Sequence, residues 1–278
     1  MELAIFSKTY KGNAEEIFQK MNNQKLNYCH FNLANIGMDM IPDYIDYDKL
    51  NNLNVLLKKY NIKLIGLSGT FNMIDCDKEN KEKNIRNFEI LCEIANILHV
   101  KTISLCTGSK SKNSKWEWDD ENETTESYNE FLETMKCLLE YAHKYNIILS
   151  IEPEASNVIN SARKARNVLD HFKDEHIKII MDAANLLNMN NYNDQDTVII
   201  EAFDLIGNDI IEAHAKNFNI SDNKIKFVAP FNGKLNYELV IKLLNKYNYK
   251  GTFVMHALEE NGVDKSIKYL KENFDALY

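Results

Sequence analysis

NIILSIEPEASNVINSARKARNVLDHFKDEHIKIIMDAANLL (Asn146–Leu187) is the stretch of the sequence that best defines the fold. It contains two short apolar runs, and the longer segment between them repeats apolar residues with the period of a helix. These residues fall on one side of the helix: Val158, Ala162, Ala165 and Leu169. Asn157 is the expected N-terminal cap of this helix. A strand, a helix and a second strand in this order form the unit from which parallel sheets are built.

The same alternation of strand and helix patterns continues in both directions along the chain. The expected strands are Leu3–Phe6, Tyr28–Asn32, Lys63–Leu67, Thr102–Cys106, Ile147–Glu152, Ile177–Asp182, Ile210–Lys216 and Thr252–His256. Helical periodicity is clearest in Arg86–Leu98 and Tyr128–Tyr145. Eight such units favour closure into an α/β fold, a single (β/α)8 TIM barrel made by residues 1–278 as one domain. An open, doubly wound sheet is the alternative, but no glycine-rich phosphate-binding motif follows the first strand.

Composition and charge exclude several classes of partner. The chain has 278 residues and a formal net charge of -8, and no run of lysine or arginine outlines a footprint for nucleic acid. No apolar stretch is long enough to span a membrane. The five cysteines include no CxxC pair, and the N-terminus has no signal-peptide pattern. We therefore expect a reduced, cytoplasmic protein that acts on a small molecule and binds neither nucleic acid nor membranes.

Polar residues end four neighbouring strands of the expected barrel. They are found in ILSIEPE, IIMDAANLL, IIEAHAKN and TFVMHALEE, and they are Glu152, Asp182, His214 and His256. The active site of such a barrel lies at the C-terminal ends of its strands, so these side chains should meet at one mouth. Two carboxylates and two imidazoles can bind a divalent first-row metal ion and leave positions open for substrate oxygens. The alternative is that each residue only ends a strand or caps the next helix.

Five motifs in this order resemble the sugar phosphate isomerase/epimerase branch of the xylose isomerase-like TIM-barrel superfamily. They are LSGTFNM (Leu67–Met73), SLCTGS (Ser104–Ser109), IEPEASNV (Ile151–Val158), MDAANLL (Met181–Leu187) and HAKN (His214–Asn217). The resemblance spans nearly the whole chain and is more specific for the superfamily than for any substrate. It implies one divalent metal ion (Mn2+, Mg2+, Co2+ or Zn2+) held after strands five to eight. The first three implied ligands match Glu152, Asp182 and His214.

The fourth implied ligand, a glutamate after strand eight, has no clear match. The corresponding position is His256, and the nearest carboxylates are Glu259 and Glu260. In the ketose 3-epimerases of the superfamily, two glutamates exchange a carbon-bound proton from opposite faces of the substrate. The resemblance implies that Glu152 is one of them, which leaves His256, Glu154 or Glu259 for the second transfer.

The remaining site residues are predicted from their positions in the sequence. Lys216 lies two residues after His214, so it should point to the same side of the strand and stabilise a negatively charged substrate oxygen. The predicted catalytic residues are thus Glu152, His256 and Lys216. The predicted substrate-binding residues are His30, Asn72, Thr107, Glu154, Asn185 and Trp116. His30 has a second interpretation, a hydrogen bond within the barrel, and Asn217 stands where the family commonly has aspartate.

The long segment Thr107–Thr124 lies between the fourth strand and the fourth helix and is expected to form a lid. The favoured function is isomerisation or epimerisation of a sugar, a sugar phosphate or a related polyol or keto acid. A metal-dependent hydrolase, lyase or dehydratase is the first alternative, and a non-catalytic sugar-binding barrel is the second. A three-zinc endonuclease needs more strand-end ligands than this sequence offers. Association into a homo-oligomer is left open.

Overall fold

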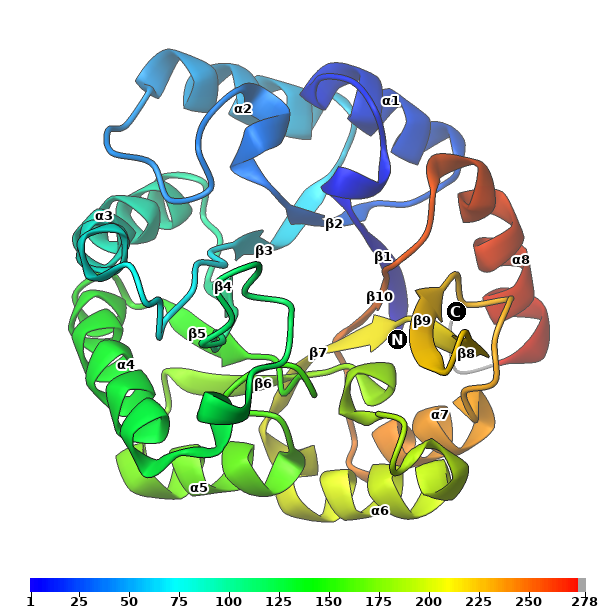
Figure 1. Cartoon of the computed structure of the whole chain (residues 1–278). Coiled ribbons are helices and arrows are strands. Elements are labelled where there is room, and N and C mark those ends of the chain that lie inside the picture. Colours follow the sequence, from blue (N-terminus) through cyan, green and yellow to red (C-terminus); the bar gives the residue numbers. More distant parts are fainter. Residues whose placement is uncertain (275–278) are drawn as a thin grey trace.

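The computed structural model describes residues 1–274, and its strands form a closed parallel barrel ringed by helices (Figure 1). The strands of the barrel are β1 (Glu2–Phe6), β2 (Tyr28–Phe31), β3 (Lys63–Ser68), β4 (Thr102–Leu105), β5 (Ile148–Ile151), β6 (Ile177–Met181), β7 (Ile210–Ala215) and β10 (Thr252–Met255). They are neighbours in this order, and β10 closes the barrel against β1 with Val254 opposite Ala4. The predicted TIM barrel is confirmed, and each predicted strand matches an observed one to within one residue at either end.

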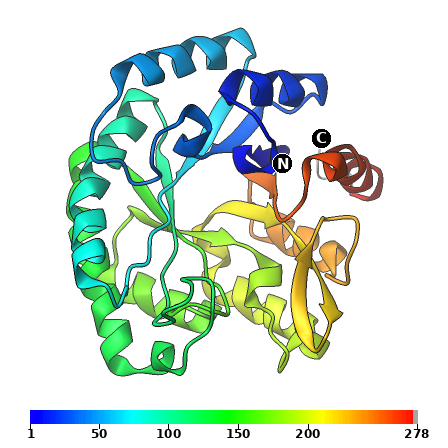
Figure 2. The ribbon, with the colours of Figure 1, turned by 45° about the horizontal axis from the view of Figure 1, so that its top comes forward.

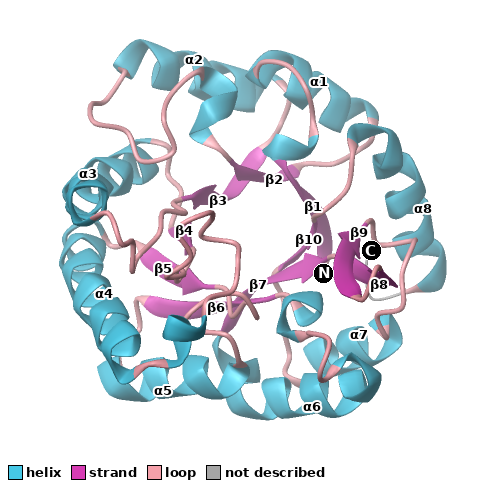
Figure 3. Cartoon of the chain, viewed as in Figure 1, coloured by secondary structure: helices cyan, strands magenta, loops and turns pink. Residues whose placement is uncertain are grey.

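Helices form the outer ring of the barrel (Figure 3). They are α1 (Ala14–Asn23), α2 (Tyr47–Lys59), α3 (Lys78–Ile97), α4 (Thr125–Tyr145), α5 (Ala162–Phe172), α6 (Gln195–Ile206), α7 (Tyr237–Lys246) and α8 (Val263–Asn273). Short 3-10 helices are η1 (Ser7–Thr9), η2 (Leu33–Ile36), η3 (Asp120–Glu123), η4 (Ala183–Leu186), η5 (Tyr192–Asp194), η6 (Gly207–Asp209) and η7 (Glu260–Gly262). None of the helices in the described part of the chain is long and apolar enough to cross a membrane.

The start of α5 differs from the sequence prediction. Ser161, not Asn157, is the N-cap, and its side chain accepts a hydrogen bond from the backbone N–H of Lys164. Asn157 instead lies in the preceding loop, where it is buried and its Oδ1 accepts a hydrogen bond from the backbone N–H of Gly108. The prediction was wrong because a polar residue before an apolar run can be fixed by tertiary contacts as well as by a helix end.

A two-stranded hairpin interrupts the alternation after β7. Its strands β8 (Asn217–Ser221) and β9 (Lys224–Val228) pair antiparallel, and Figure 2 shows them (yellow to orange) standing beside the barrel. Asp222 and Asn223 form the turn with φ of 53° and 56°, a conformation that suits these two residue types. Asn217 fixes the base of the hairpin, since its Oδ1 accepts from the backbone N–H of Leu235 and its Nδ2 donates to the carbonyl of Pro230.

An apolar layer closes the barrel interior below the mouth. Ala4, Phe6 and Val254 pack together there, with Tyr28 and Ile65 partly buried against them. The Phe6 ring also lies 4.3 Å from the His30 ring and 4.7 Å from the His256 ring, measured between centroids. The layer therefore lies directly beneath the polar residues at the C-terminal ends of the strands.

Candidate active site

Four strand ends bring carboxylate and imidazole groups together at the mouth. Glu152, Asp182 and His256 directly follow β5, β6 and β10, and His214 lies in β7. Nδ1 of His214 is 3.1 Å from Oε1 of Glu152 and 3.4 Å from Oδ2 of Asp182. Nδ1 of His256 is 3.9 Å from the same Asp182 oxygen. The residues singled out in the sequence thus share one site.

Three of these residues form a group suited to a cation. Asp182, His214 and His256 each offer one donor atom, and these atoms lie within 4.8 Å of one another. Oδ2 of Asp182 and Nδ1 of His256 are buried and have no hydrogen-bond partner in the described structure. A buried polar atom without a partner is costly, so a bound cation would satisfy Nδ1 of His256 and add to the ion pair that Oδ2 of Asp182 makes with Lys216. Carboxylate oxygen and imidazole nitrogen are common ligands of zinc and other divalent first-row metals, so the group fits such an ion.

Glu152 borders this group and is held by its neighbours. Nδ2 of Asn185 donates a hydrogen bond of 2.7 Å to Oε1 of Glu152. Oδ1 of Asn185 in turn accepts a hydrogen bond from Nζ of Lys216. That ammonium group is also 3.0 Å from Oδ2 of Asp182 and lies 3.9 Å from the centroid of the Phe227 ring. Lys216 and Asn185 therefore join the two carboxylates into one network.

A second polar layer supports the site from below. Oε1 of Glu212 accepts a hydrogen bond of 2.9 Å from Nε2 of His214 and lies 3.0 Å from Nδ1 of His30. Nε2 of His30 is 3.0 Å from Oγ of Ser104. The His30 ring packs against Gly66, where a Cβ would come within 2.9 Å of its Cε1. All these side chains are buried, so they position the groups above them and do not face the opening.

Electrostatics keeps the carboxylates of the site ionised. Burial opposes ionisation of Asp182, but Lys216 and His214 outweigh it and hold the pKa of Asp182 well below its usual value. Burial likewise opposes ionisation of Glu152, and the charge of His214 brings its pKa below the usual value. Burial disfavours the charged form of His214, yet the surrounding carboxylates raise its pKa well above the ordinary value.

The pKa values of His256 and Glu154 shift in the directions opposite to those of His214 and Glu152. Burial lowers the pKa of His256 to about 4, helped by the positive charge of Lys216, so its imidazole is neutral at pH 7 and able to act as a ligand. Burial raises the pKa of Glu154 to about 7, against the opposing charge of Lys216. The site therefore holds an ionised carboxylate at Glu152 and, two residues further along the chain, a carboxyl group that can carry a proton near neutral pH.

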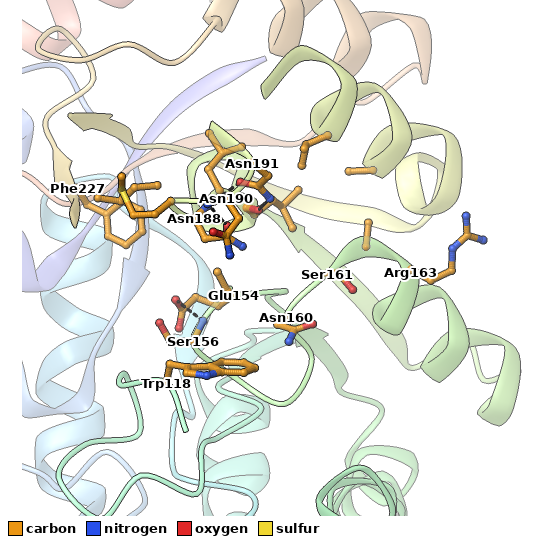
Figure 4. Close-up of a pocket in the computed structure, with 18 of the residues that line it drawn as sticks. Trp118, Glu154, Ser156, Asn160, Ser161, Arg163, Asn188, Asn190, Asn191 and Phe227 are labelled. Carbon is orange, nitrogen blue, oxygen red and sulfur yellow. Dashed lines mark hydrogen bonds between the residues drawn. The ribbon is translucent and has the colours of Figure 1, made fainter. Parts of the chain in front are cut away.

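A large cavity adjoins the site, and three of the predicted substrate-binding residues are at or next to it. It has a volume of about 1030 Å³ and is lined by Glu154 and by Trp116, among others. Figure 4 shows Glu154 among the labelled residues of the lining. Glu154 is almost fully buried, and its Oε2 has no hydrogen-bond partner in the described structure. Asn185 does not line the cavity but lies directly before Leu186, which does.

The other three predicted substrate-binding residues make internal hydrogen bonds. His30 is fully buried with both ring nitrogens engaged, so the structure favours its second interpretation, a hydrogen bond within the barrel. Thr107 is also fully buried, and its hydroxyl accepts a hydrogen bond from the backbone N–H of Ile159. The amide of Asn72 bonds the backbone of Ser109 through both its oxygen and its nitrogen. These contacts hold the loops of the mouth in place.

The eighth strand of the barrel, β10, offers no glutamate to the site. Glu259 is exposed, and Glu260 lies outside the mouth, where its Oε1 is 2.7 Å from Nζ of Lys20. The imidazole of His256, directly after β10, is the group that faces Asp182. Asn217 is buried in the hairpin base and does not enter the site.

Several site residues were not identified from the sequence. Glu212 and His214 lie in β7 and Lys216 directly follows it, so the period of two that placed Lys216 in the site also places Glu212 on the same side. Lys8 lies close enough to Glu152 and Lys216 for their charges to act on it, and its surroundings lower its pKa, chiefly through lost contact with water. No sequence pattern indicates Lys8, because it follows β1 in a 3-10 turn.

A second group of potential ligands lies at the opposite end of the barrel. His143, Asp174 and His176 have donor atoms within 4.8 Å of one another and precede β5 and β6 in the chain. Nε2 of His143 is 2.7 Å from Oδ2 of Asp174, a contact that is partly exposed. This group is far from the C-terminal strand ends and plays no part in the site at the mouth.

Comparison with known proteins assigns the family. The family model described as "Xylose isomerase-like TIM barrel" matches residues 30–273. The chain belongs to this family. No curated protein matches the sequence.

Three solved structures are similar to this chain over nearly their whole length. The probable 3-DHS dehydratase AsbF from Bacillus anthracis has a TM-score of 0.76 at 15% identity, covering 98% of this chain and 100% of that one. D-psicose 3-epimerase from Clostridium cellulolyticum H10 has a TM-score of 0.72 at 13% identity, with 98% and 97% covered. IOLI protein with a bound zinc atom has a TM-score of 0.73 at 14% identity, with 100% and 98% covered. At such low identities the likeness concerns the fold.

Proposed function

We propose that this xylose isomerase-like barrel is a divalent-metal-dependent isomerase or epimerase of a sugar, a sugar phosphate or a related polyol or keto acid. The observation that carries the proposal is the meeting of donor atoms from Asp182, His214 and His256 at one point, with Nδ1 of His256 buried and without a hydrogen-bond partner. The proposed ligands are these three residues and Glu152 at their edge. An epimerase and a zinc-containing protein among the similar structures support the assignment.

The residues have separate tasks in the proposed reaction. A divalent ion bound there would polarise the substrate carbonyl and make the adjacent carbon more acidic. Oε1 of Glu152 faces His214 and Asn185, which leaves Oε2 to receive the carbon-bound proton. Nζ of Lys216 stabilises the negative charge that develops on the substrate oxygen.

In an isomerisation Glu152 itself can return the proton, whereas an epimerisation requires a second group that reaches the opposite face of the substrate carbon. We assign this second transfer to Glu154, because its buried Oε2 has no hydrogen-bond partner and it follows Glu152 by two residues after β5. Glu259, the other carboxylate considered from the sequence, is exposed. A neutral His256 completes the ligand group and keeps Asp182 in place.

A metal-dependent dehydratase is a second candidate, supported by the similar fold of a probable 3-DHS dehydratase. Removal of a proton next to a carbonyl is also the first step of many dehydrations, so the same Glu152 could serve both reactions. A hydrolase, another lyase or a non-catalytic sugar-binding barrel would use the same donor group in a different way.

One experiment separates these candidates. The purified protein is first analysed for bound metal and then incubated in D2O with a panel of aldoses, ketoses and sugar acids, followed by NMR. Deuterium on the product carbon indicates proton transfer, and an isomer without deuterium indicates a hydride shift. Loss of water from the substrate supports the dehydratase. Absence of stoichiometric metal after reconstitution with Mn2+, Co2+ or Zn2+ would overturn the proposal.

A further inference from the structure

We propose that the cavity beside the metal-ligand group is a subsite for a second, neutral sugar ring, so that the substrate is a disaccharide or glycoside. The inference rests on the proposed function for the chemistry at the first ring. The cavity has a volume of about 1030 Å³, at the upper end of the range of about 300–1,000 Å³ usual for small-molecule sites. This is more space than one sugar ring fills.

The cavity begins where the proposed reaction site ends. The four proposed metal ligands do not line it, but Glu154, Leu186 and Phe227 do. Glu154 follows Glu152 by two residues, and Phe227 packs against the ammonium group of Lys216. A substrate whose reacting carbon lies between Glu152 and Lys216 would therefore extend into this space.

Aromatic side chains border the cavity and are exposed to it. Trp116 and Trp118 come from the loop after β4, and Phe227 comes from β9 of the hairpin. Their exposed fractions of 50%, 39% and 40% are large for aromatic residues. In Figure 4 the Trp118 ring lies on one side of Glu154 and Ser156, and Asn188, Asn190 and Asn191 lie on the other. Aromatic faces of this kind stack on the C–H faces of sugar rings.

The loop after β4 that carries Trp116 and Trp118, here called the tryptophan loop, is held in place before any ligand binds. Nδ2 of the buried Asn157 donates to the carbonyl of Lys115, and Nε1 of Trp118 donates to Oδ1 of Asp120. Oγ of Ser109 donates to the carbonyl of Glu117. These hydrogen bonds fix the backbone on both sides of Trp116, so less conformational entropy is lost when a ligand stacks there.

The polar groups of the cavity suit hydroxyl groups better than a phosphate. Oε2 of Glu154 is buried without a hydrogen-bond partner, and the side chain of Asn190 is exposed in the lining of the cavity. Arg163, a cation of the lining, is paired with Glu201 at 3.2 Å. The other one, Lys224, is exposed on the hairpin. Amide and carboxyl groups beside aromatic rings are a combination that selects a neutral polyhydroxylated ring.

Tryptophan fluorescence tests the proposal directly, because Trp116 and Trp118 are the two tryptophans of the chain. The full-length protein is titrated with cellobiose, maltose and lactose, and in parallel with glucose, galactose and inorganic phosphate. We expect at least one disaccharide to change the emission at a concentration at least tenfold below that of its monosaccharides. The Trp116→Phe and Trp118→Phe variants show which ring reports the change.

Calorimetry of two further variants locates the binding. Trp118→Ala and Asn190→Ala should each weaken the binding of that disaccharide by about tenfold or more while leaving monosaccharide and metal binding unchanged. Tyr44→Ala removes an exposed aromatic residue that does not line the cavity, and it should have no effect.

The outcomes separate this proposal from the one on which it rests. Equal binding of disaccharide and monosaccharide, unchanged affinity in Trp118→Ala, or tighter binding of phosphate would overturn the subsite, whatever the activity of the protein. Disaccharide binding that depends on Trp118 in a protein without metal or turnover would instead uphold the subsite and remove the isomerase.

Discussion

Glu212 accepts a hydrogen bond of 2.9 Å from Nε2 of His214, from the side opposite the ligand group. With its proton on Nε2, the imidazole directs Nδ1 toward Asp182 and Glu152. A carboxylate behind a ligating histidine fixes both the tautomer and the ring orientation. Glu212 is itself oriented by His30, which bonds Ser104 in turn.

Glu212→Gln should weaken metal binding without removing a ligand. We expect the affinity for Zn2+ to fall by about 10–100-fold, because an amide is a weaker acceptor and can present its N–H groups to both histidines. Titration against a competing chelator measures the affinity. Glu89→Gln, at a surface ion pair with Lys144, is the matched control and should bind Zn2+ like the native protein. An unchanged affinity in Glu212→Gln would show that the lower layer does not support the metal.

Metal binding should be weaker at low pH. The carboxylates around His214 raise its pKa well above the ordinary value, so the metal-free imidazole carries a proton that the metal must displace. The affinity for Zn2+ should therefore rise between pH 6 and pH 8. Calorimetric titrations in two buffers with different enthalpies of ionisation would count the protons released, and a release of none would contradict this account of His214.

Most of the fold could be predicted because the strand and helix patterns are strongly periodic. The strand predicted as Ile177–Asp182 is observed as Ile177–Met181, and the eight-unit pattern led directly to the barrel. The hairpin of β8 and β9 was missed because it is an insertion into a repeating pattern. Its signal is present nonetheless, since Asp222 and Asn223 separate two short alternating runs.

The residues at the C-terminal ends of the strands could be predicted as site residues. How deeply a side chain lies inside the barrel could not be predicted. Sequence position placed Glu152, Asp182, His214 and His256 around one point, because parallel strands of a barrel end at the same face. It could not distinguish His30, which ends a strand but is buried beneath the site, from a residue of the opening. That distinction depends on how strands are staggered around the barrel, which local patterns do not encode.

His256→Gln tests whether the residue directly after β10 belongs to the reaction site. Loss of the imidazole removes one proposed ligand, and we expect turnover to fall at least about tenfold, or roughly 1.4 kcal/mol of barrier. The exposed Glu259 serves as the comparison, since Glu259→Gln should leave turnover and metal content unchanged. The reverse pattern, with loss in Glu259→Gln alone, would assign the fourth ligand to the loop after β10 and exclude His256.

Glu130 provides a test of stability that is independent of catalysis. Its carboxylate, on α4, receives ammonium groups from both Lys81 of α3 and Lys110 of the loop after β4. Burial opposes its ionisation, but the hydrogen bonds from the two lysines hold the pKa below the usual value. Glu130→Gln leaves both ammonium groups without their carboxylate, so the free energy of unfolding at pH 7 should fall by about 1–2 kcal/mol.

The pH dependence of this difference gives the decisive comparison. Because the folded-state pKa of Glu130 lies below that of the unfolded chain, its contribution is complete above about pH 4.3 and is lost as the pH falls through the folded-state value. Urea unfolding of the native protein and of Glu130→Gln should therefore differ by a constant amount from pH 8 to pH 5 and converge at lower pH. Glu15→Gln breaks the exposed pair with Lys59 and should have little effect at any pH. A difference between native protein and Glu130→Gln that persisted into acid would mean that packing, and not charge, stabilises this junction of α3, α4 and the tryptophan loop.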